Sequence, residues 1–251
     1  VPADISRFGW SGPYMITEWG PNGYWESPQT PWKVAVEPTS TQKKSDYTER
    51  YQRYIAPFPS CLGSYAFLWG AKQEYTETWF GLFSKDNKRT EPIDALEYIF
   101  SGKQPSNPCP SIKEFSLDHK NASDGIRLKA GNRCEASVKA SFPEEGYYHD
   151  TLSNSTITYD WKILGESEDK KSGGDREAEA TRINTRFRGK RSPQVSFTAP
   201  DTPGAYRLFV FAYGNGKVAC ANIPFQVLPR SVEDGPAHLI SFKRQKMEFL
   251  R

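Results

Sequence analysis

Apolar and polar positions in the first part of the chain predict a strand followed by a helix. Tyr14 to Thr17 form a short apolar run, which indicates a buried strand. Ser40 then predicts the start of a helix, and Pro57 predicts its end. Apolar residues between them recur at the i, i+4, i+7, i+8 spacing of one helix face: Tyr47, Tyr51, Tyr54 and Ile55.

A second strand and helix repeat this plan. Gly63 to Gly70 read as a buried strand, and a long loop leads to a helix near Pro92 to Phe100 that Gly102 ends. Short strands alternating with helices favour parallel pairing with right-handed crossovers, as in a βα barrel or a doubly wound sheet. We therefore expect residues 1–103 to form an α/β domain.

The pattern changes after the segment from Gly102 to Pro110, which contains three prolines. Residues 104–110 cannot sustain a helix or a central strand, and we place a linker there. Beyond it apolar residues alternate with polar ones, as expected for strands with one buried face. The alternating positions are Cys134, Ala136, Val138 and Ala140, and a second strand is predicted from Thr158 to Leu164.

The clearest strand pair is a hairpin from Ala205 to Leu228, which turns at Gly214-Asn215-Gly216. These strands predict an all-β unit, a β-sandwich over residues 111–229. Trp161 lies between Cys134 and Cys220 in the sequence, which is similar to immunoglobulin-like packing in its broad outline. Residues 230–251 form a basic tail that either docks on a partner or stays partly ordered.

Charge and composition exclude some classes of partner. Lysine and arginine number 33 against 30 acids, and this balance argues against a nucleic acid or an anionic membrane surface as partner. No apolar run approaches the roughly 18 residues of a membrane span. Seven Trp and thirteen Tyr either fill cores or offer flat faces on which sugar rings stack.

Cysteine and sequon content favours a secreted protein. Four cysteines, Cys61, Cys109, Cys134 and Cys220, have no close spacing for a metal site, so disulfides or buried thiols are expected. Asn121 and Asn154 begin glycosylation sequons. We expect an extracellular glycoprotein with disulfides.

Glu18 is the strongest candidate for a catalytic carboxylate. It follows the Tyr14–Thr17 strand directly, and catalytic groups of a βα barrel collect at the carboxyl ends of its strands. A glycosidic carbon needs such a carboxylate on one face and an acid on the other. The next loop is rich in residues that either line sugar subsites or pack over the rim, among them Trp19, Asn22 and Trp25.

The order strand, Glu18-Trp19-Gly20, aromatic loop, helix and Gly63–Gly70 resembles the last two strands of the retaining glycoside hydrolase clan. It is most similar to the family-two type, which includes β-galactosidases, β-mannosidases and β-glucuronidases, over residues 8–103. The resemblance implies Glu18 as the nucleophile and Trp69 as the aromatic floor of the sugar site. The fold it implies is the C-terminal βα units of a TIM barrel, here followed by an immunoglobulin-like β-sandwich.

The chain departs from that family at the acid/base residue. The family keeps a Glu after an Asn there, and no Asn-Glu pair occurs in the 251 residues. We therefore expect the C-terminal portion of a retaining glycoside hydrolase, with an upstream segment or a second chain completing the barrel and carbohydrate as the ligand. The alternative is a noncatalytic extracellular module for glycan binding or assembly.

Cofactor chemistry finds no support in the sequence. His119, His149 and His238 are scattered without metal-ligand spacing, and no glycine-rich loop cradles a phosphate. We expect no metal and no cofactor.

Overall fold

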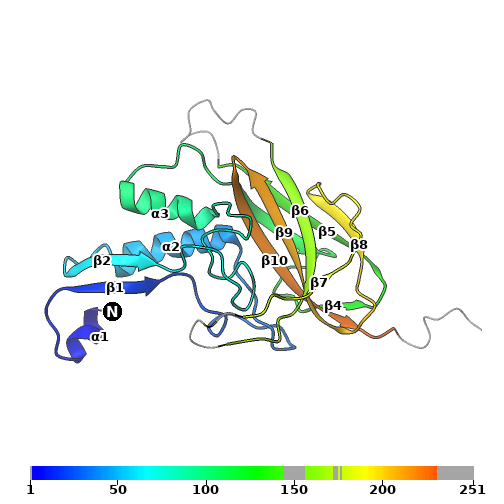
Figure 1. Cartoon of the computed structure of the whole chain (residues 1–251), viewed down its shortest axis with the longest axis horizontal. Coiled ribbons are helices and arrows are strands. Elements are labelled where there is room, and N and C mark those ends of the chain that lie inside the picture. The colour runs from blue at the N-terminus through cyan, green and yellow to red at the C-terminus, as the bar shows by residue number, and fades with distance from the viewer. Residues whose placement is uncertain (1, 144–155, 172–174, 176, 231–251) are drawn as a thin grey trace, which may run out of the picture.

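The computed structural model describes residues 2–143, 156–171, 175 and 177–230 (Figure 1). The helices are α1 (Pro2–Arg7), α2 (Ser40–Tyr54) and α3 (Glu91–Ser101). The strands are β1 (Tyr14–Trp19), β2 (Cys61–Ala66), β3 (Ser111–Leu117), β4 (Ile126–Lys129), β5 (Arg133–Ser141), β6 (Thr158–Gly165), β7 (Arg182–Ile183), β8 (Gln194–Thr198), β9 (Gly204–Gly214) and β10 (Lys217–Leu228).

Within the described residues the strands form three separate sheets, and none of these closes into a barrel. Their orders are β1-β2, β4-β10-β9-β6-β7 and β3-β5-β8. The described part of the chain is mostly β, so the expected fold class, with C-terminal βα units of a TIM barrel over residues 1–103, is wrong.

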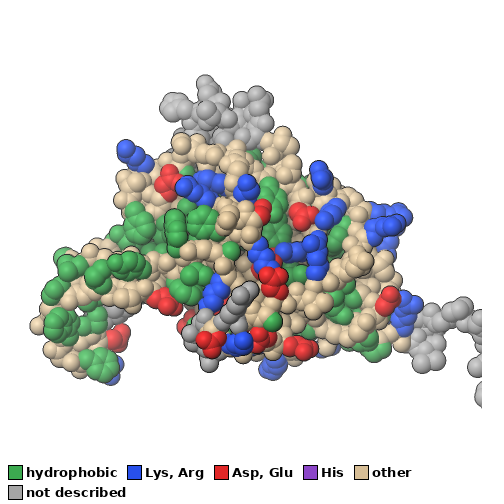
Figure 2. All heavy atoms as spheres, in the orientation of Figure 1, with side chains coloured by type: hydrophobic (Ala, Val, Ile, Leu, Met, Phe, Trp, Pro, Cys, Tyr) green, Lys and Arg blue, Asp and Glu red, His purple; other side chains and the backbone are tan. Residues whose placement is uncertain are grey.

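Exposure along β1 and β2 gives the physical reason. The two strands pair in parallel, but strands of a barrel are covered on both faces. Here Met15, Leu62 and Tyr65 are 51%, 69% and 59% exposed, so the predicted burial is not found. Figure 2 shows hydrophobic side chains gathered on the surface of this part of the molecule.

The two larger sheets pack against each other around one apolar core. Trp161 on β6, Leu208 on β9 and Phe225 on β10 face Val138 on β5 and Phe197 on β8 across it. All five side chains are buried, and burial of apolar area on this scale is the main source of stability in such an arrangement.

The predicted hairpin is confirmed by β9 and β10, which pair antiparallel along their whole length. Asn215 and Gly216 make the turn with φ values of 55° and 72°. Two successive residues with positive φ match the right-handed twist of the strands they join, which explains the Asn-Gly pair.

The second face of β9 and β10 is also buried. Phe209, Phe211, Val218 and Cys220 point away from the sandwich core and form a cluster of their own. The helices α2 and α3 lie beside this face, with α2 and α3 both contacting β10 (Figure 1). Burial on both faces explains why these strands are near-continuous apolar runs instead of alternating ones.

The four cysteines are all described and all free, so the expected disulfides do not form. Cys134 faces the sandwich core, whereas Cys220 faces the opposite side of its sheet. The buried-thiol alternative holds for Cys109, Cys134 and Cys220, while Cys61 is partly exposed.

The helix ends follow local chemistry. Thr39, one residue before the predicted cap Ser40, accepts a hydrogen bond from the Gln42 N–H, and the Gln42 side chain accepts one from the Thr39 N–H. This reciprocal pair is a capping box. Gly102 ends α3 in the left-handed conformation with φ 69°, as predicted.

Several sequence predictions lie outside the described residues: the sequon at Asn154, His149, His238 and the basic tail from residue 231 onward. The boundary at 104–110 stays a prediction. Among the described residues, no helix combines the length and the apolar character that crossing a bilayer requires.

Candidate functional site

Glu18 stands at the end of β1 in a hollow of about 460 Å³. We call it the Glu18 hollow; it is lined by Ile16, Glu18, Trp19, Gly20, Asp46, Glu49, Arg50, Tyr54 and Ile55. The Glu18 side chain is exposed. Within the described residues, no hydrogen bond or ion pair engages its carboxylate. The carboxylate is therefore available to a ligand.

The structure brings Trp19 and Asn22 to α2, where both have structural partners. The Trp19 ring packs against Tyr47 and Tyr51, with ring centroids 5.2 and 5.9 Å apart. The Arg50 guanidinium donates hydrogen bonds to the Asn22 side-chain oxygen and, at 2.7 Å, to the Gly20 carbonyl. Arg50 thus fixes the loop that follows Glu18 against the helix.

Trp25 and Trp69 are the two exposed aromatic residues of the predicted site, at 64% and 67% exposure. The Trp25 ring centroid lies 6.2 Å from that of Phe80, and the Trp69 centroid lies 5.2 Å from that of Phe83. The Phe67 N–H donates to the Trp19 carbonyl at 2.8 Å. This bond brings the segment that carries Trp69 to the end of β1.

Two acids on α2 share the hollow with Glu18, and sequence reasoning missed both. Asp46, Glu49 and Arg50 lie at i, i+3 and i+4, a spacing that places them on one helix face and so could have revealed them. Burial raises the pKa of Asp46 above its ordinary value; Arg50 opposes this shift and Glu49 adds to it.

A larger groove adjoins the Glu18 hollow. It measures about 1080 Å³ and lies between the start of α2, with the loop before it, and β3 with the turn after it. We call it the α2–β3 groove; its lining includes Asn22, Thr39, Gln42, Asp46, Phe115, Ser116, Asn121, Ser123 and Ser137. Asp46 lines both spaces, so the groove and the hollow are neighbours at this residue.

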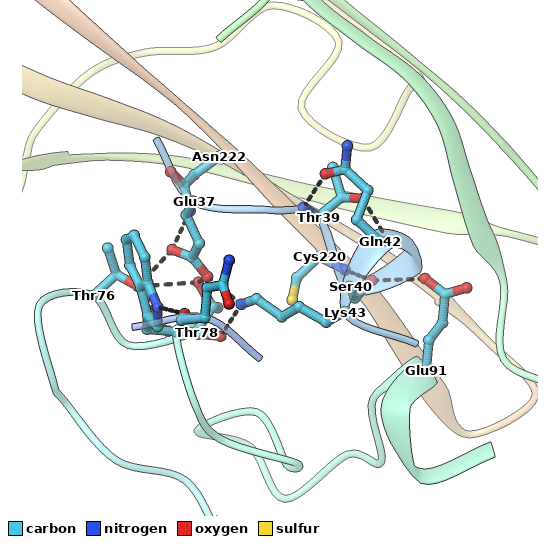
Figure 3. Close-up of polar contacts among 12 residues, drawn as sticks. Glu37, Thr39, Ser40, Gln42, Lys43, Thr76, Thr78, Glu91, Cys220 and Asn222 are labelled. Carbon is cyan, nitrogen blue, oxygen red and sulfur yellow. Dashed lines mark hydrogen bonds and ion pairs between the residues drawn. The ribbon is translucent and has the colours of Figure 1, made fainter. Parts of the chain in front are cut away.

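A buried polar network centred on Glu37 joins α2 to β10 (Figure 3). The Glu37 carboxylate accepts from Lys43 at 2.5 Å and from Asn222 at 2.5 Å. It also accepts from the Thr76 and Thr78 hydroxyls at 2.6 and 2.8 Å. Every partner comes from within the chain, so this network is structural and leaves no group for a substrate.

Charge explains why Glu37 stays ionised although it is buried. Burial by itself raises its pKa, but the Lys43 ammonium and hydrogen bonds from Lys43 and Thr76 outweigh that effect and hold the pKa below its ordinary value. The carboxylate and the ammonium therefore stabilise each other inside the molecule.

A second buried carboxylate, Glu91 at the start of α3, has only hydroxyl donors. Ser40, Thr41 and Ser111 donate to it at 2.7, 2.6 and 2.7 Å (the Ser40 contact is drawn in Figure 3). Burial raises its pKa, and these hydrogen bonds only partly oppose the rise. The Ser40 hydroxyl also accepts from the Cys220 N–H at 2.9 Å, which connects α2 to β10 again.

Two further buried ion pairs involve strands of the larger sheet, one on β9 and one on β10. Arg207 binds both oxygens of Glu166 at 2.8 and 3.0 Å and donates to the Ala35 carbonyl at 2.6 Å. Lys217 on β10 binds Asp94 on α3 at 2.6 Å. Among the described residues, no group of three or more His, Cys, Asp or Glu side chains is placed to hold a metal ion.

Comparison with known proteins gives no family. Neither the models of known protein families nor the curated proteins match this sequence. Distant structural neighbours include glycoside hydrolases, and the three described next have TM-scores below 0.5.

The first of these neighbours is a nucleoside hydrolase-related protein from Saccharophagus degradans associated with carbohydrate metabolism, with 14% identity, a TM-score of 0.32, and 55% of this chain and 29% of that chain covered. The endo-β-1,4-mannanase of Thermotoga petrophila follows, with 13% identity, a TM-score of 0.23, and 90% and 41% covered. A family 123 glycoside hydrolase of Clostridium perfringens has 11% identity, a TM-score of 0.20, and 42% and 23% covered. Scores this low carry no argument about this chain, which spans under half the length of each.

Proposed function

We propose that this chain is part of a carbohydrate-active protein, in which Glu18 attacks or stabilises the anomeric carbon of a glycoside with retention. The observation that carries the proposal is the exposed Glu18 carboxylate, which no described residue engages and which opens into the Glu18 hollow. A retaining mechanism needs such a carboxylate on one face of the sugar ring. The acid/base group is expected on sequence outside these 251 residues, because the Asn-Glu pair is absent from them.

Exposed aromatic rings support carbohydrate as the ligand class. Trp25 and Trp69 keep most of their surface in solvent, although burial of rings of this size is strongly favourable. A flat exposed ring suits the apolar face of a pyranose. We propose Trp69 as the stacking residue and Trp25 as part of a more distant subsite, while Trp19 and Asn22 shape the loop beside Glu18.

The experiment is turnover of aryl β-glycosides by the complete protein and by its Glu18→Gln variant. Loss of the nucleophile should lower kcat by at least about a thousandfold. Glu49→Gln is the matched control, since it removes a carboxylate from the same hollow and should change kcat less than about threefold. A 2-deoxy-2-fluoro glycoside should add one sugar mass to Glu18 in the wild type only. Full activity in Glu18→Gln would exclude this role.

A noncatalytic glycan-binding module is the second candidate. The lack of an Asn-Glu pair in the sequence favours it, together with the exposed rings of Trp25 and Trp69. In this case Glu18→Gln would retain oligosaccharide binding, Trp69→Ala would lose it, and no form of the complete protein would turn over any glycoside.

Extracellular location is part of the proposal. Asn121 begins a sequon and is exposed, so it is accessible to glycosylation. Because the four cysteines are free, disulfides do not support the expected secretion of the protein. A mobility shift of the native protein on treatment with an N-glycosidase would support the location, and an unshifted band would count against it.

A further inference from the structure

The α2–β3 groove has the dimensions of a ligand site. Ligand pockets typically enclose roughly 300–1,000 Å³, and this groove encloses about 1080 Å³. One side is the start of α2 and the loop before it, and the other is the outer part of β3 and β5. Both sides rest on buried elements, because Glu37 holds the loop to β10 and Ile112 of β3 is buried.

Uncharged groups with spare hydrogen-bonding capacity line the groove. Gln42 and Asn22 use their amide oxygens in hydrogen bonds with Thr39 and Arg50, so their NH₂ groups remain available as donors. Within the described part of the chain, no hydrogen bond engages the side chain of Ser123. Side-chain amides and hydroxyls both donate and accept, as recognition of a polyhydroxylated ligand requires.

The charges along the groove balance, which disfavours an ionic ligand. Glu114 and Lys139 pair with each other at 2.7 Å. Glu37 is neutralised by Lys43 inside the molecule. Lys113 and Asp46 carry opposite charges, so no excess of one sign remains to hold a phosphate or a carboxylate.

A small apolar surface accompanies these polar groups. The half-buried Phe115, with its ring centroid 5.8 Å from that of Trp161, and the exposed Pro28 supply it, whereas Ile112 and Ile223 behind them are buried. The C–H faces of sugar rings pack on such surfaces while their hydroxyls reach amides and hydroxyls at the edges. A neutral sugar therefore matches both parts of the lining.

We propose that the α2–β3 groove binds a neutral oligosaccharide. The inference rests on the proposed function for its ligand class, but the groove does not include Glu18. Because Asp46 lines both spaces, a chain of several sugar units bound in the groove extends toward the Glu18 hollow. The groove then supplies subsites, and the hollow receives the end of the ligand.

Calorimetric titration of the purified, unglycosylated chain with mannohexaose, cellohexaose and xylohexaose tests the proposal, with trigalacturonate as the charged comparison. At least one neutral hexaose should bind, and trigalacturonate should bind at least about tenfold more weakly. Ser123→Trp fills the groove from an exposed turn and should weaken binding at least about tenfold, which corresponds to about 1.4 kcal/mol. Ser106→Trp is the matched control, at an exposed serine outside the lining, and should leave affinity unchanged.

Glu18→Gln separates this inference from the proposed function. Binding that Glu18→Gln retains and Ser123→Trp loses supports the groove. Binding that Glu18→Gln loses and Ser123→Trp retains places the ligand in the hollow alone and overturns the groove. The groove is also overturned if no neutral hexaose binds or if trigalacturonate binds more tightly, whereas the role of Glu18 is decided separately by turnover.

Discussion

Glu37 and Glu91 are both buried carboxylates, and their surroundings shift their pKa values in opposite directions. Burial opposes ionisation in each. Glu37 has the Lys43 ammonium and its pKa falls below the ordinary 4.5, whereas Glu91 has hydroxyl donors and its pKa rises above 4.5. Whether the partner carries a positive charge therefore decides if the pKa of the buried carboxyl falls or rises.

These shifts predict opposite pH dependences of stability. The lowered pKa of Glu37 means that its contribution is present above pH 4.5 and is lost as pH falls through the folded-state pKa. The raised pKa of Glu91 means that its contribution is complete below pH 4.5 and is lost as pH rises through its folded-state pKa. Urea unfolding of the wild type, Glu37→Gln and Glu91→Gln from pH 3 to pH 8 measures both pH dependences.

For Glu37→Gln, the loss of unfolding free energy should be greatest near neutral pH, about 3 kcal/mol, because Lys43 is left buried without its counter-charge. For Glu91→Gln, the difference from the wild type should be greatest near pH 4 and should shrink or reverse toward pH 8. Parallel pH profiles for the two variants would contradict this assignment.

At the scale of the element, α2 carries contacts on three sides. Its N-terminus begins at the capping box and borders the α2–β3 groove, Arg50 holds the loop after Glu18, and Lys43 reaches Glu37. The apolar spacing that predicts this helix reveals none of these roles, because polar residues carry them. Its polar residues determine how the groove and the hollow are shaped.

The cap of α2 gives a test at this scale. Thr39→Ala removes the side-chain acceptor of the Gln42 N–H and should lower the unfolding free energy by about 1 kcal/mol. Ser45→Ala is the control: its hydroxyl bonds back to the Thr41 carbonyl within the helix, and alanine favours helix there, so stability should change by less than about 0.5 kcal/mol. If the two variants changed the free energy of unfolding equally in chemical denaturation, the capping box would contribute nothing to stability.

Local signals were sufficient for some elements and not for others. Gly102 and Asn215-Gly216 were predictable because a left-handed backbone conformation leaves few residue types to choose from. The barrel prediction failed because strand and helix spacing in residues 1–103 does not specify how many strands gather in a sheet. Burial of Tyr14–Thr17 could not be read from composition, since the exposed Met15 is as apolar as a core residue.

The candidate site was predictable to the same limited extent. The place of Glu18 at a strand end follows from the sequence, and the helical spacing of Asp46 and Arg50 was present but not used. Tertiary contacts with Phe80, Phe83 and Tyr47 decide that Trp25 and Trp69 are exposed and that Trp19 is packed. No sequence pattern therefore distinguishes the two exposed rings from the packed one.

Across the whole molecule, buried polar contacts bind α3 and the loop before α2 to the sheet. Lys217 and Asp94 meet across α3 and β10, and Arg207 reaches the Ala35 carbonyl. Removing one partner of such a pair leaves an uncompensated charge in the interior, which costs more than the loss of an equal apolar contact. The first hundred residues therefore depend on β9 and β10 for their stability.

This dependence predicts that residues 1–103 do not fold alone. Without β10, Asp94 and Glu37 lose Lys217 and Asn222, and the exposed strands β1 and β2 add little apolar burial. The amide proton NMR spectrum of this fragment should show the narrow dispersion of an unfolded chain, while residues 1–230 should show a wide one. A well-dispersed spectrum from the fragment would contradict the prediction.

The Glu37–Asn222 contact, 185 positions apart in sequence, has a consequence for how this chain can evolve. The two residues of an apolar contact can be substituted independently, since many apolar side chains fill similar volumes. A buried carboxylate with a specific amide and a specific ammonium does not, because a change at one position leaves the others without a partner. In descendants of a common ancestor, positions 37, 43 and 222 should change together or not at all, so the helical segment and the sheet are inherited as one unit.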